Sequence, residues 1–208
     1  MTPEQQWQSV LARDIRADGK LAMKPSLYRQ GAPGANIAYT IFDSALGKAL
    51  LAATKAGVCA ISFGEDEQAL AQTLNREFPR AVLRRDEASL QHFVRAIDDH
   101  LAGNAPVLDL PLDIRATAFQ SLVWKALRSI PRGETRTYSE VAEAIGRPRA
   151  VRAVAHACAS NPVALAIPCH RVVHRTGHAM GYRWGVARKR QLPALEQSGN
   201  RAIEQSGN

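Results

Sequence analysis

The amino-acid sequence predicts an α+β protein in which a small domain built on an antiparallel sheet precedes a helical domain. Short β-rich runs occur within residues 37–63, two helix-capping boxes open the second half, and the basic charge is confined to that half. Such runs are typical of strands, and a Thr-x-x-Gln or Thr-x-x-Glu box before apolar residues is typical of a helix start. At 208 residues the chain is long enough for one large domain or two small ones.

Three strands and two helices are predicted in the first half. In order, the strands are residues 37–42, 50–54 and 58–63, and the helices are residues 67–78 and 88–101. The last two strands are separated by a hairpin-length turn that contains Gly57. Because residues 108–114 are interrupted by Pro111, we interpret them as a linker and place the domain boundary near residue 112. The first domain is thus predicted to span residues 36–111, and the second residues 112–196.

The second half is predicted to contain a helix-turn-helix. The two capping boxes are Thr117-x-x-Gln120 and Thr137-x-x-Glu140, and each is followed by apolar residues at helical spacing. The helix after the second box stops at Gly146, and Pro148 fits the first position of the next helix. Two short helices joined by a tight turn that contains glycine make a helix-turn-helix pattern.

The second helix of this pattern has an exposed face of arginine and small side chains. Its apolar stripe is Val151, Val154, Ala155 and Cys158, which leaves Arg149, Ala153 and His156 opposite and Arg152 at the edge. A face of this kind can approach a nucleic-acid groove closely. An ordinary helical hairpin with a solvated arginine face is the alternative, and the distribution of charge distinguishes the two.

The charge changes along the chain. Residues 1–111 contain 12 Lys and Arg against 13 Asp and Glu, whereas residues 112–208 contain 15 against 6, within a total of +8. A basic half next to a balanced half is expected if only the basic half contacts a polyanion. This asymmetry favours DNA contact over the ordinary hairpin.

Composition excludes several classes of protein. With 46% hydrophobic and 22% charged residues, the sequence is unlike disordered, collagen-like or fibrous chains. No run approaches the roughly 20 apolar residues of a membrane span, and residues 1–10 lack the pattern of a secretion signal. The three cysteines form no C-x-x-C pair, so we expect free thiols. We therefore expect a cytoplasmic monomer that needs no membrane and no cofactor.

Cys169 is the candidate nucleophile. It follows the apolar run 163–168, which we expect to be buried, and it precedes His170 and Arg171. A cysteine in such a run is most often an inert core residue. The two ionic neighbours argue against an inert thiol, because a cationic neighbour lowers a thiol pKa and the thiolate is the attacking species. On a strand, His170 could reach Cys169 only through a turn or a bridging water molecule, and an acid would have to orient the imidazole.

A metal site is an alternative interpretation of the same segment. His170, His174 and His178 recur at intervals of four, which on a helix would place three ligands on one face. Pro168, the β-branched residues after Arg171 and Gly177 all oppose a helix there. The sequence therefore favours a site without metal.

The segment Ile167-Pro168-Cys169-His170-Arg171-Val172-Val173 resembles the active-site signature of the O6-alkylguanine-DNA alkyltransferases, the methylated-DNA–protein-cysteine methyltransferases. Four further segments fall at the spacing of that family: Thr137-Tyr138-Ser139, residues 149–154, Asn161-Pro162, and residues 181–185. The resemblance covers about residues 36–196, and these motifs are most similar to those of the bacterial Ada-type branch. It implies a ribonuclease-H-like sheet domain, then a helical domain that enters the minor groove of DNA and extrudes a damaged base.

The resemblance also implies roles for individual residues. Cys169 would accept the alkyl group from O6-alkylguanine, and also from O4-alkylthymine, in a single irreversible turnover. His170 would act as the base through a water molecule, with Glu196 orienting its ring. The residues implied in contacts to DNA or to the flipped base are Tyr138, Arg149, Arg152, Ala153, Asn161, Val172 and Arg183. Among them, Arg152 would fill the gap left by the base, and Asn161 would hold the turn before Cys169. The backbone of Cys169, Val172 and Arg183 would line the base pocket. The partner would be double-stranded DNA.

The sequence departs from the family pattern at its two ends. Pro193 falls just before Glu196, and a proline inside a helix would kink the segment that positions this acid. The five residues 196–200, Glu-Gln-Ser-Gly-Asn, recur at 204–208, and we expect residues 197–208 to be a disordered tail. Residues 18–33, within an N-terminal extension 1–35, resemble the end of an AraC-type helix-turn-helix. A damage-sensing or regulatory DNA-binding protein without transfer activity is therefore an alternative function.

Overall fold

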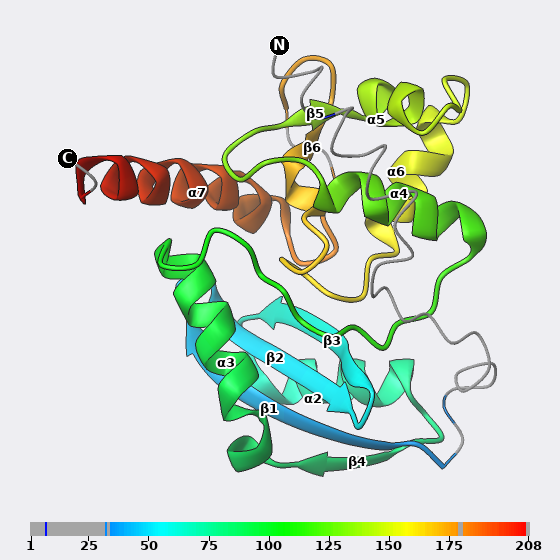
Figure 1. The fold of residues 1–208 in the computed structure, drawn as a ribbon. Helices are drawn as coiled ribbons and strands as arrows, with labels where there is room; N and C mark the ends of the chain where they lie inside the picture. The colour runs from blue at the N-terminus through cyan, green and yellow to red at the C-terminus, as the bar shows by residue number, and fades with distance from the viewer. Residues whose placement is uncertain (1–6, 8–31, 33, 179–180, 207–208) are drawn as a thin grey trace.

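The protein has an N-terminal sheet domain and a C-terminal helical domain that lie one above the other (Figure 1). The computed structural model describes residues 7, 32, 34–178 and 181–206, with side chains up to Gln197. In chain order the elements are β1 (Asn36–Ser44), β2 (Gly47–Thr54), β3 (Gly57–Gly64), α2 (Glu67–Glu77), β4 (Val82–Arg85), α3 (Glu87–Ala102), α4 (Ala118–Arg128), β5 (Arg136–Thr137), α5 (Tyr138–Ala144), α6 (Val151–Ala159), η1 (Cys169–Arg171), β6 (Val172–Val173) and α7 (Val186–Ser206). The three predicted strands and two predicted helices of the first domain are confirmed.

The sheet has the strand order β3-β2-β1-β4. The pairs β1–β2 and β2–β3 are antiparallel, as predicted, and a fourth strand that the sequence did not predict, β4, joins β1 in parallel. The sequence pattern did not reveal β4 because it is a four-residue edge strand without an apolar repeat, and its Val82 is 58% exposed. The helix α2 connects β3 to β4, so the chain crosses β2 and β1 before β4 pairs with β1 at the other edge of the sheet.

The two faces of the sheet pack against different helices. Along β2, Ala49, Leu51 and Ala53 lie in a cluster with Leu90, Ile97 and Leu101 of α3, whereas Leu50 and Ala52 lie in a cluster with Leu70 and Leu74 of α2. Successive residues of a strand point to opposite faces, which is why the cluster alternates from one residue to the next. Figure 1 shows α3 and α2 on opposite sides of the sheet.

The helix-turn-helix of the second domain is formed by α5 and α6. Both predicted capping boxes are present with reciprocal hydrogen bonds, at Thr117 with Gln120 and at Thr137 with Glu140. The prediction that Pro148 begins the second helix is wrong: α6 begins at Val151, because the amide of Ala150 closes a turn on the carbonyl of Arg147. The turn places the arginines that precede α6 outside the helix.

The two domains are joined along the outer edge of β3. The amide of Val58 donates to the carbonyl of Pro111 at 2.8 Å, and the amide of Ile61 donates to the carbonyl of Pro162 at 3.0 Å. The predicted linker packs on the sheet through buried residues, Leu108, Leu110 and 112–114, whereas Asp109 and Pro111 between them are exposed. Gly57 is required at this junction, because a Cβ at its position would lie 2.4 Å from the carbonyl oxygen of Pro111. One apolar cluster spans both domains and contains Cys169.

The last helix, α7, begins in the second domain and contacts both η1 and α3. It continues through Pro193 to Ser206, so most of the segment expected to be a disordered tail has a helical backbone. The AraC-like segment 18–33 lies outside the described residues, apart from Ala32. Among the described helices, none combines the length and the apolar character that a membrane crossing requires.

Candidate active site and DNA-binding surface

The segment 161–168 leads to Cys169 and is buried, as predicted, with only Pro162 partly exposed. Asn161 holds this segment in a turn: its Oδ1 accepts from the amide of Val163 at 2.9 Å, and its Nδ2 donates to the carbonyl of Ile167 at 2.8 Å. The same Nδ2 lies 3.3 Å from Sγ of Cys169. Leu165 adopts φ +65°, an unfavourable conformation for a branched side chain that only the surrounding packing can impose.

Cys169 and His170 belong to a 3₁₀ turn, η1, and not to the strand that the sequence suggested. The amide of Arg171 closes this turn on the carbonyl of Pro168 at 3.0 Å. Cys169 is 2% exposed and His170 is fully buried. A turn removes the strict alternation of a strand, so that neighbouring side chains can serve one site.

His170 and Glu196 form a buried pair. Nε2 of His170 lies 2.8 Å from Oε1 of Glu196. Burial lowers the pKa of His170, and the hydrogen bond and charge of Glu196 oppose this effect. A neutral imidazole therefore donates its Nε2–H to the carboxylate, and its other nitrogen, Nδ1, keeps a free electron pair. Pro193 lies inside α7 and does not prevent Glu196 from contacting His170.

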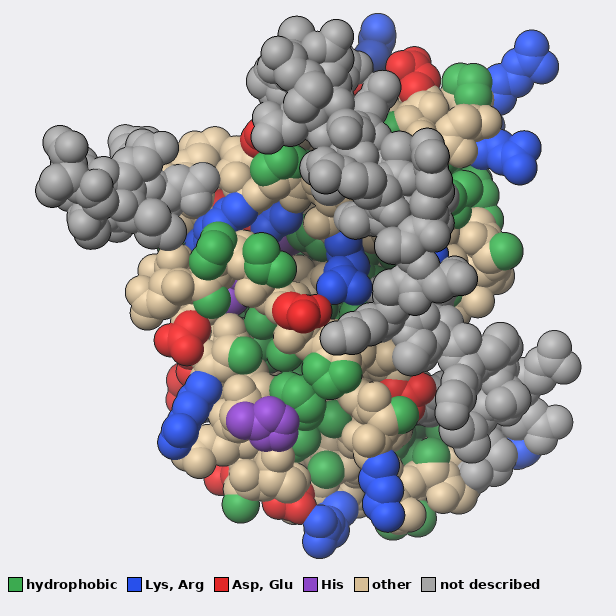
Figure 2. All heavy atoms as spheres, in the orientation of Figure 1, with side chains coloured by type: hydrophobic (Ala, Val, Ile, Leu, Met, Phe, Trp, Pro, Cys, Tyr) green, Lys and Arg blue, Asp and Glu red, His purple; other side chains and the backbone are tan. Residues whose placement is uncertain are grey.

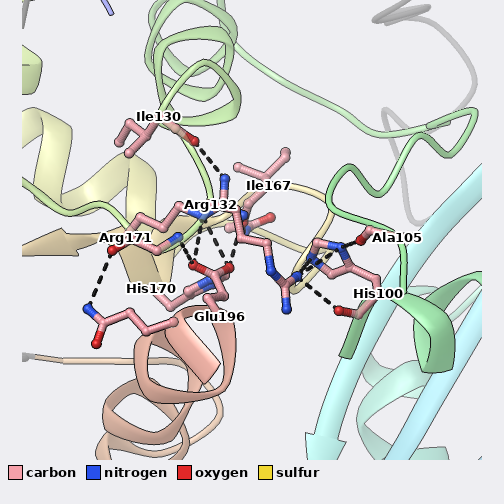
Figure 3. A network of polar contacts seen from close by, with 11 residues as sticks. His100, Ala105, Ile130, Arg132, Ile167, His170, Arg171 and Glu196 are labelled. Atoms are coloured by element: carbon pink, nitrogen blue, oxygen red, sulfur yellow. Dashed lines mark hydrogen bonds and ion pairs between the residues drawn. The ribbon is translucent and has the colours of Figure 1, made fainter. Parts of the chain in front are cut away.

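Arg171 and a backbone amide hold the other side of Glu196 (Figure 3). Nη2 of Arg171 donates to Oε1 at 2.9 Å, and the amide of Gly133 donates to Oε2 at 3.0 Å. Nη1 of Arg171 donates to the carbonyl of Ile130 at 2.6 Å. The hydrogen bonds and charges of His170 and Arg171 hold the pKa of Glu196 well below its usual range against the effect of burial. The carboxylate is ionised and is fixed by two separate segments, η1 and the loop that contains Gly133.

The electrostatics of the thiol differ from the sequence-based expectation. His170 is neutral and Arg171 is paired with Glu196, so neither supplies the cation that was expected to lower the thiol pKa. Burial raises the pKa of Cys169, and the hydrogen bond from Asn161 and the charge of Lys189 only partly offset it. Cys169 is therefore a thiol at rest, and a nearby base must take its proton before it can attack.

A cavity of about 390 Å³ opens at Cys169. Tyr138, Arg152, Tyr182 and Lys189 contribute to its lining together with Cys158. Nζ of Lys189 donates to the hydroxyl oxygen of Tyr138 at 3.1 Å, and burial raises the pKa of Tyr138 to about 12. The phenol is therefore protonated and can donate a hydrogen bond to a molecule in the cavity.

The outer surface beside the cavity is basic. Arg149, Arg152 and Ala153 are exposed, and Arg152 also lines the cavity. In Figure 2, Lys and Arg side chains project at the upper right, over α5 and α6, whereas acidic and basic side chains are mixed over the sheet domain below. This is the arrangement that the charge asymmetry of the sequence predicts.

Val172 and Arg183, whose backbone is implied at the base pocket, have other surroundings for their side chains. Val172 is fully buried in β6, and neither Val172 nor Arg183 lines the cavity at Cys169. The guanidinium of Arg183 forms an ion pair with Glu77 at the end of α2. Arg183 thus connects the loop before α7 to the sheet domain.

The alternative metal site is not formed as proposed. His170 is buried against Glu196, whereas His174 is partly exposed, His178 is exposed, and both contact Thr176. The segment is a 3₁₀ turn followed by a short strand, so the three histidines do not share a helical face. Within the described part of the chain, no group of three or more His, Cys, Asp or Glu side chains is arranged to hold a metal ion.

Sequence reasoning missed Lys189 and Tyr182. Lys189 is 2% exposed, although lysine is almost never fully buried, and no local pattern in residues 186–190 marks it as different from its charged neighbours. Tyr182 belongs to the motif 181–185, which by itself assigns it no role. Both residues line the cavity, which contains Cys169, and α7 packs against η1.

Comparison with known proteins identifies the class of protein. The family described as "6-O-methylguanine DNA methyltransferase, ribonuclease-like domain" matches residues 37–114, and "6-O-methylguanine DNA methyltransferase, DNA binding domain" matches residues 118–198. These matches confirm the two predicted domain types.

Individual relatives agree with this assignment. The methylated-DNA–protein-cysteine methyltransferase of Methanosarcina acetivorans is 38% identical over 160 residues, 77% of this chain and 98% of that protein. The "Bifunctional transcriptional activator/DNA repair enzyme Ada" of Escherichia coli is 47% identical over 177 residues, 85% of this chain. The crystal structure of Mycobacterium tuberculosis OGT in complex with DNA is 36% identical, with a TM-score of 0.66, over 78% of this chain and 94% of that one.

The chain belongs to the O6-methylguanine DNA methyltransferase family. The matched part of the chain covers 50% of the length of the Escherichia coli relative.

Proposed function

We propose that this protein repairs DNA by transferring an alkyl group from O6-alkylguanine to Sγ of Cys169, once and irreversibly. The observation that supports this most directly is the buried arrangement of thiol, imidazole and carboxylate beside a cavity on a basic surface. O4-alkylthymine is a second expected substrate. The three free, buried cysteines fit a reducing compartment, and we place the protein in the cytoplasm as a monomer.

The chemistry begins with the thiol proton. Cys169 gives its proton through a water molecule to Nδ1 of His170, and Glu196 stabilises the imidazolium that forms. The thiolate then attacks the alkyl carbon, a carbon–sulfur bond forms, and the carbon–oxygen bond to guanine breaks. The electron pair of that bond stays on guanine, and the hydroxyl of Tyr138 donates a hydrogen bond to the ring as this negative charge develops.

The single turnover follows from the product. A thioether on Cys169 has no electrophilic carbonyl for water to attack, and the buried site offers no leaving group that would restore the thiol. The protein is therefore consumed by the reaction.

The DNA has to be opened before this reaction can occur. The alkylated oxygen lies inside the duplex, and an enzyme that acts on a base extrudes it into a pocket. We propose that α6 contacts the minor groove, that Arg149 and Ala153 lie against the DNA, and that Arg152 fills the space of the extruded base. A lesion with weakened pairing costs less to extrude, which favours damaged over normal guanine.

The test is transfer of one methyl group. After the protein is mixed with a duplex containing O6-methylguanine, mass spectrometry is expected to show one added methyl group on the peptide that contains Cys169, and the duplex is expected to contain guanine. The Cys169→Ser variant is the control and should stay unmodified. Tight binding of the damaged duplex with an unmodified Cys169 in the parent protein would contradict the proposal and support the damage-sensing alternative.

A further inference from the structure

Two buried polar atoms beside Cys169 have no hydrogen-bond partner among the residues that the structure describes. They are Nδ1 of His170 and the hydroxyl oxygen of Tyr182. Tyr182 lines the same cavity as Cys169, and the two side chains interact electrostatically. Buried polar atoms in proteins nearly always have a partner, which is either protein or an ordered water molecule. Two such atoms around one nucleophile therefore call for a common explanation.

The two atoms have complementary hydrogen-bonding roles. Nε2 of His170 donates to Glu196, so Nδ1 is an acceptor. Burial, together with the nearby Cys169 sulfur, raises the pKa of Tyr182 well above its ordinary value, so the phenol keeps its proton and is a donor. His170 follows Cys169 directly in η1, and Tyr182 shares the cavity with Cys169, so one water molecule next to the thiol is the simplest group that serves both the acceptor and the donor.

We propose that Nδ1 of His170 and the hydroxyl of Tyr182 hold one water molecule against Sγ of Cys169, and that Tyr182 is thereby a positioning residue for proton transfer. The water accepts from the phenol and from the S–H group, and it donates to Nδ1. These three hydrogen bonds match the number that buried waters usually make. The inference rests on the proposed function, and it adds the residue that fixes the water between thiol and base.

The proton balance of this step is complete without another reactant. The water takes the proton of Cys169 and passes one of its own to Nδ1 of His170, so that thiolate, imidazolium and water remain. Tyr182 keeps its proton throughout. Its hydrogen bond fixes one lone pair of the water, which leaves the other facing the thiol.

The ring of Tyr182 is held in place by its neighbours. It packs edge-on against Trp184 with a centroid distance of 5.0 Å. The other titratable or charged groups around the site are Tyr138 on α5, Arg152 and Cys158 on α6, Arg171 on η1, His174 after β6, and Arg188, Lys189 and Glu196 on α7. Removal of the hydroxyl alone leaves this packing and these charges unchanged.

The test is the Tyr182→Phe variant, which removes only the hydroxyl. The rate of methyl transfer from an O6-methylguanine duplex is measured across pH, and the rate at which iodoacetamide modifies Cys169 is measured in parallel without DNA. We expect both rates to fall roughly three- to tenfold at neutral pH, as the loss of one hydrogen bond implies. We also expect both pH profiles to shift upward, while duplex affinity is unchanged. Tyr39→Phe, on β1 away from the cavity, is the matched control.

Each outcome of this experiment decides one proposal. Parent-like rates and pH profiles in Tyr182→Phe would overturn the inference, as would a lower rate with an unchanged pH profile, which would assign Tyr182 to packing. A thermal melt of the variant verifies that it is folded, and Tyr182→Trp, which retains an aromatic ring but not the hydroxyl, is expected to show the same shift. In another outcome, the parent protein fails to accept methyl groups from DNA while its iodoacetamide pH profile still differs from that of Tyr182→Phe. That result would contradict the proposed function and would support the water site.

Discussion

The ammonium nitrogen of Lys189 lies 3.1 Å from the hydroxyl oxygen of Tyr138, inside the cavity that contains Cys169. Burial lowers the pKa of Lys189, and its positive charge opposes the rise that burial causes in the pKa of Cys169. One side chain on α7 thus contacts the phenol on α5 and favours the thiolate on η1.

Lys189→Met is expected to slow methyl transfer about tenfold or more at neutral pH, because a thiol pKa that is higher by one unit lowers the thiolate fraction about tenfold. Met nearly preserves the volume of the side chain and removes a buried charge, so the fold should remain stable. The measurement is the rate of Cys169 methylation as a function of pH. Lys55→Met, in the exposed turn between β2 and β3, is the control. A Lys189→Met rate equal to that of the control would refute this role.

Glu196→Gln is expected to destabilise the fold as well as slow transfer. The change leaves the guanidinium of Arg171 buried without its carboxylate, and loss of one partner of a buried pair costs about 3–5 kcal/mol. The double variant Arg171→Gln/Glu196→Gln should lose less stability than Glu196→Gln. Urea unfolding measures both, with Glu87→Gln in the exposed pair with Arg85 as a control that should cost below about 1 kcal/mol. A double variant less stable than the single one would contradict the pairing.

Arg152 and Arg149 are expected to differ in what their removal affects. Arg152→Ala should reduce repair more than it reduces nonspecific DNA binding, because Arg152 lines the cavity where an extruded base would leave its gap. Arg149→Ala should instead weaken binding to damaged and undamaged duplexes alike and reduce the salt dependence, with a slope change of about 1 per lost phosphate contact. Binding titrations at several salt concentrations and single-turnover rates separate the two. Identical effects from both variants would count against the proposed role of Arg152.

The ion pair between Glu77 and Arg183 is expected to position the loop that contains Tyr182. Reversal of either charge should slow methyl transfer, because the loop loses its attachment to α2. The swap Glu77→Arg/Arg183→Glu should restore part of the rate. Both side chains are partly exposed, so solvent screening limits the effect to below about 1 kcal/mol, and high salt should reduce it further. No recovery in the swapped variant would show that the pair does not hold the loop.

His100 is expected to make the fold sensitive to acid. Burial lowers its pKa from 6.5 to about 4, so between these values the unfolded chain binds a proton that the folded protein excludes. Stability therefore falls as pH decreases through this range, by up to ~3 kcal/mol from this residue. His100→Gln keeps a donor for the carbonyl of Ala105 and should lose less stability between pH 7.5 and pH 4.5. The exposed His92→Gln should behave as the parent protein. Equal slopes for parent and His100→Gln would exclude this contribution.

Local patterns predicted the strands and helices of the described domains well, since each pattern reports a short stretch of chain. The capping boxes at Thr117 and Thr137 form as expected because the interacting groups are three residues apart. The strand β4 escaped notice because its partner β1 lies about 45 residues earlier in the chain, and an exposed edge strand has no buried face to mark it.

Pro193 shows the limit of a local argument. Helix propensity predicts that this proline displaces Glu196, yet Glu196 is 3% exposed and bound by His170, Arg171 and the amide of Gly133. These contacts come from segments 25 to 63 residues away in sequence. Together these contacts hold the carboxylate in place although Pro193 interrupts one turn of α7.

The order of residues is enough to show that a cysteine lies next to a histidine at the end of an apolar run, on a basic helical domain with a helix-turn-helix. Those features depend on the order of residues and on the composition of each half. Tertiary structure alone decided the protonation of the site. The pKa of a thiol depends on the burial and the charges that surround it in space. In this fold Arg171 turns away from Cys169 toward Glu196, while Lys189 approaches from a distant helix.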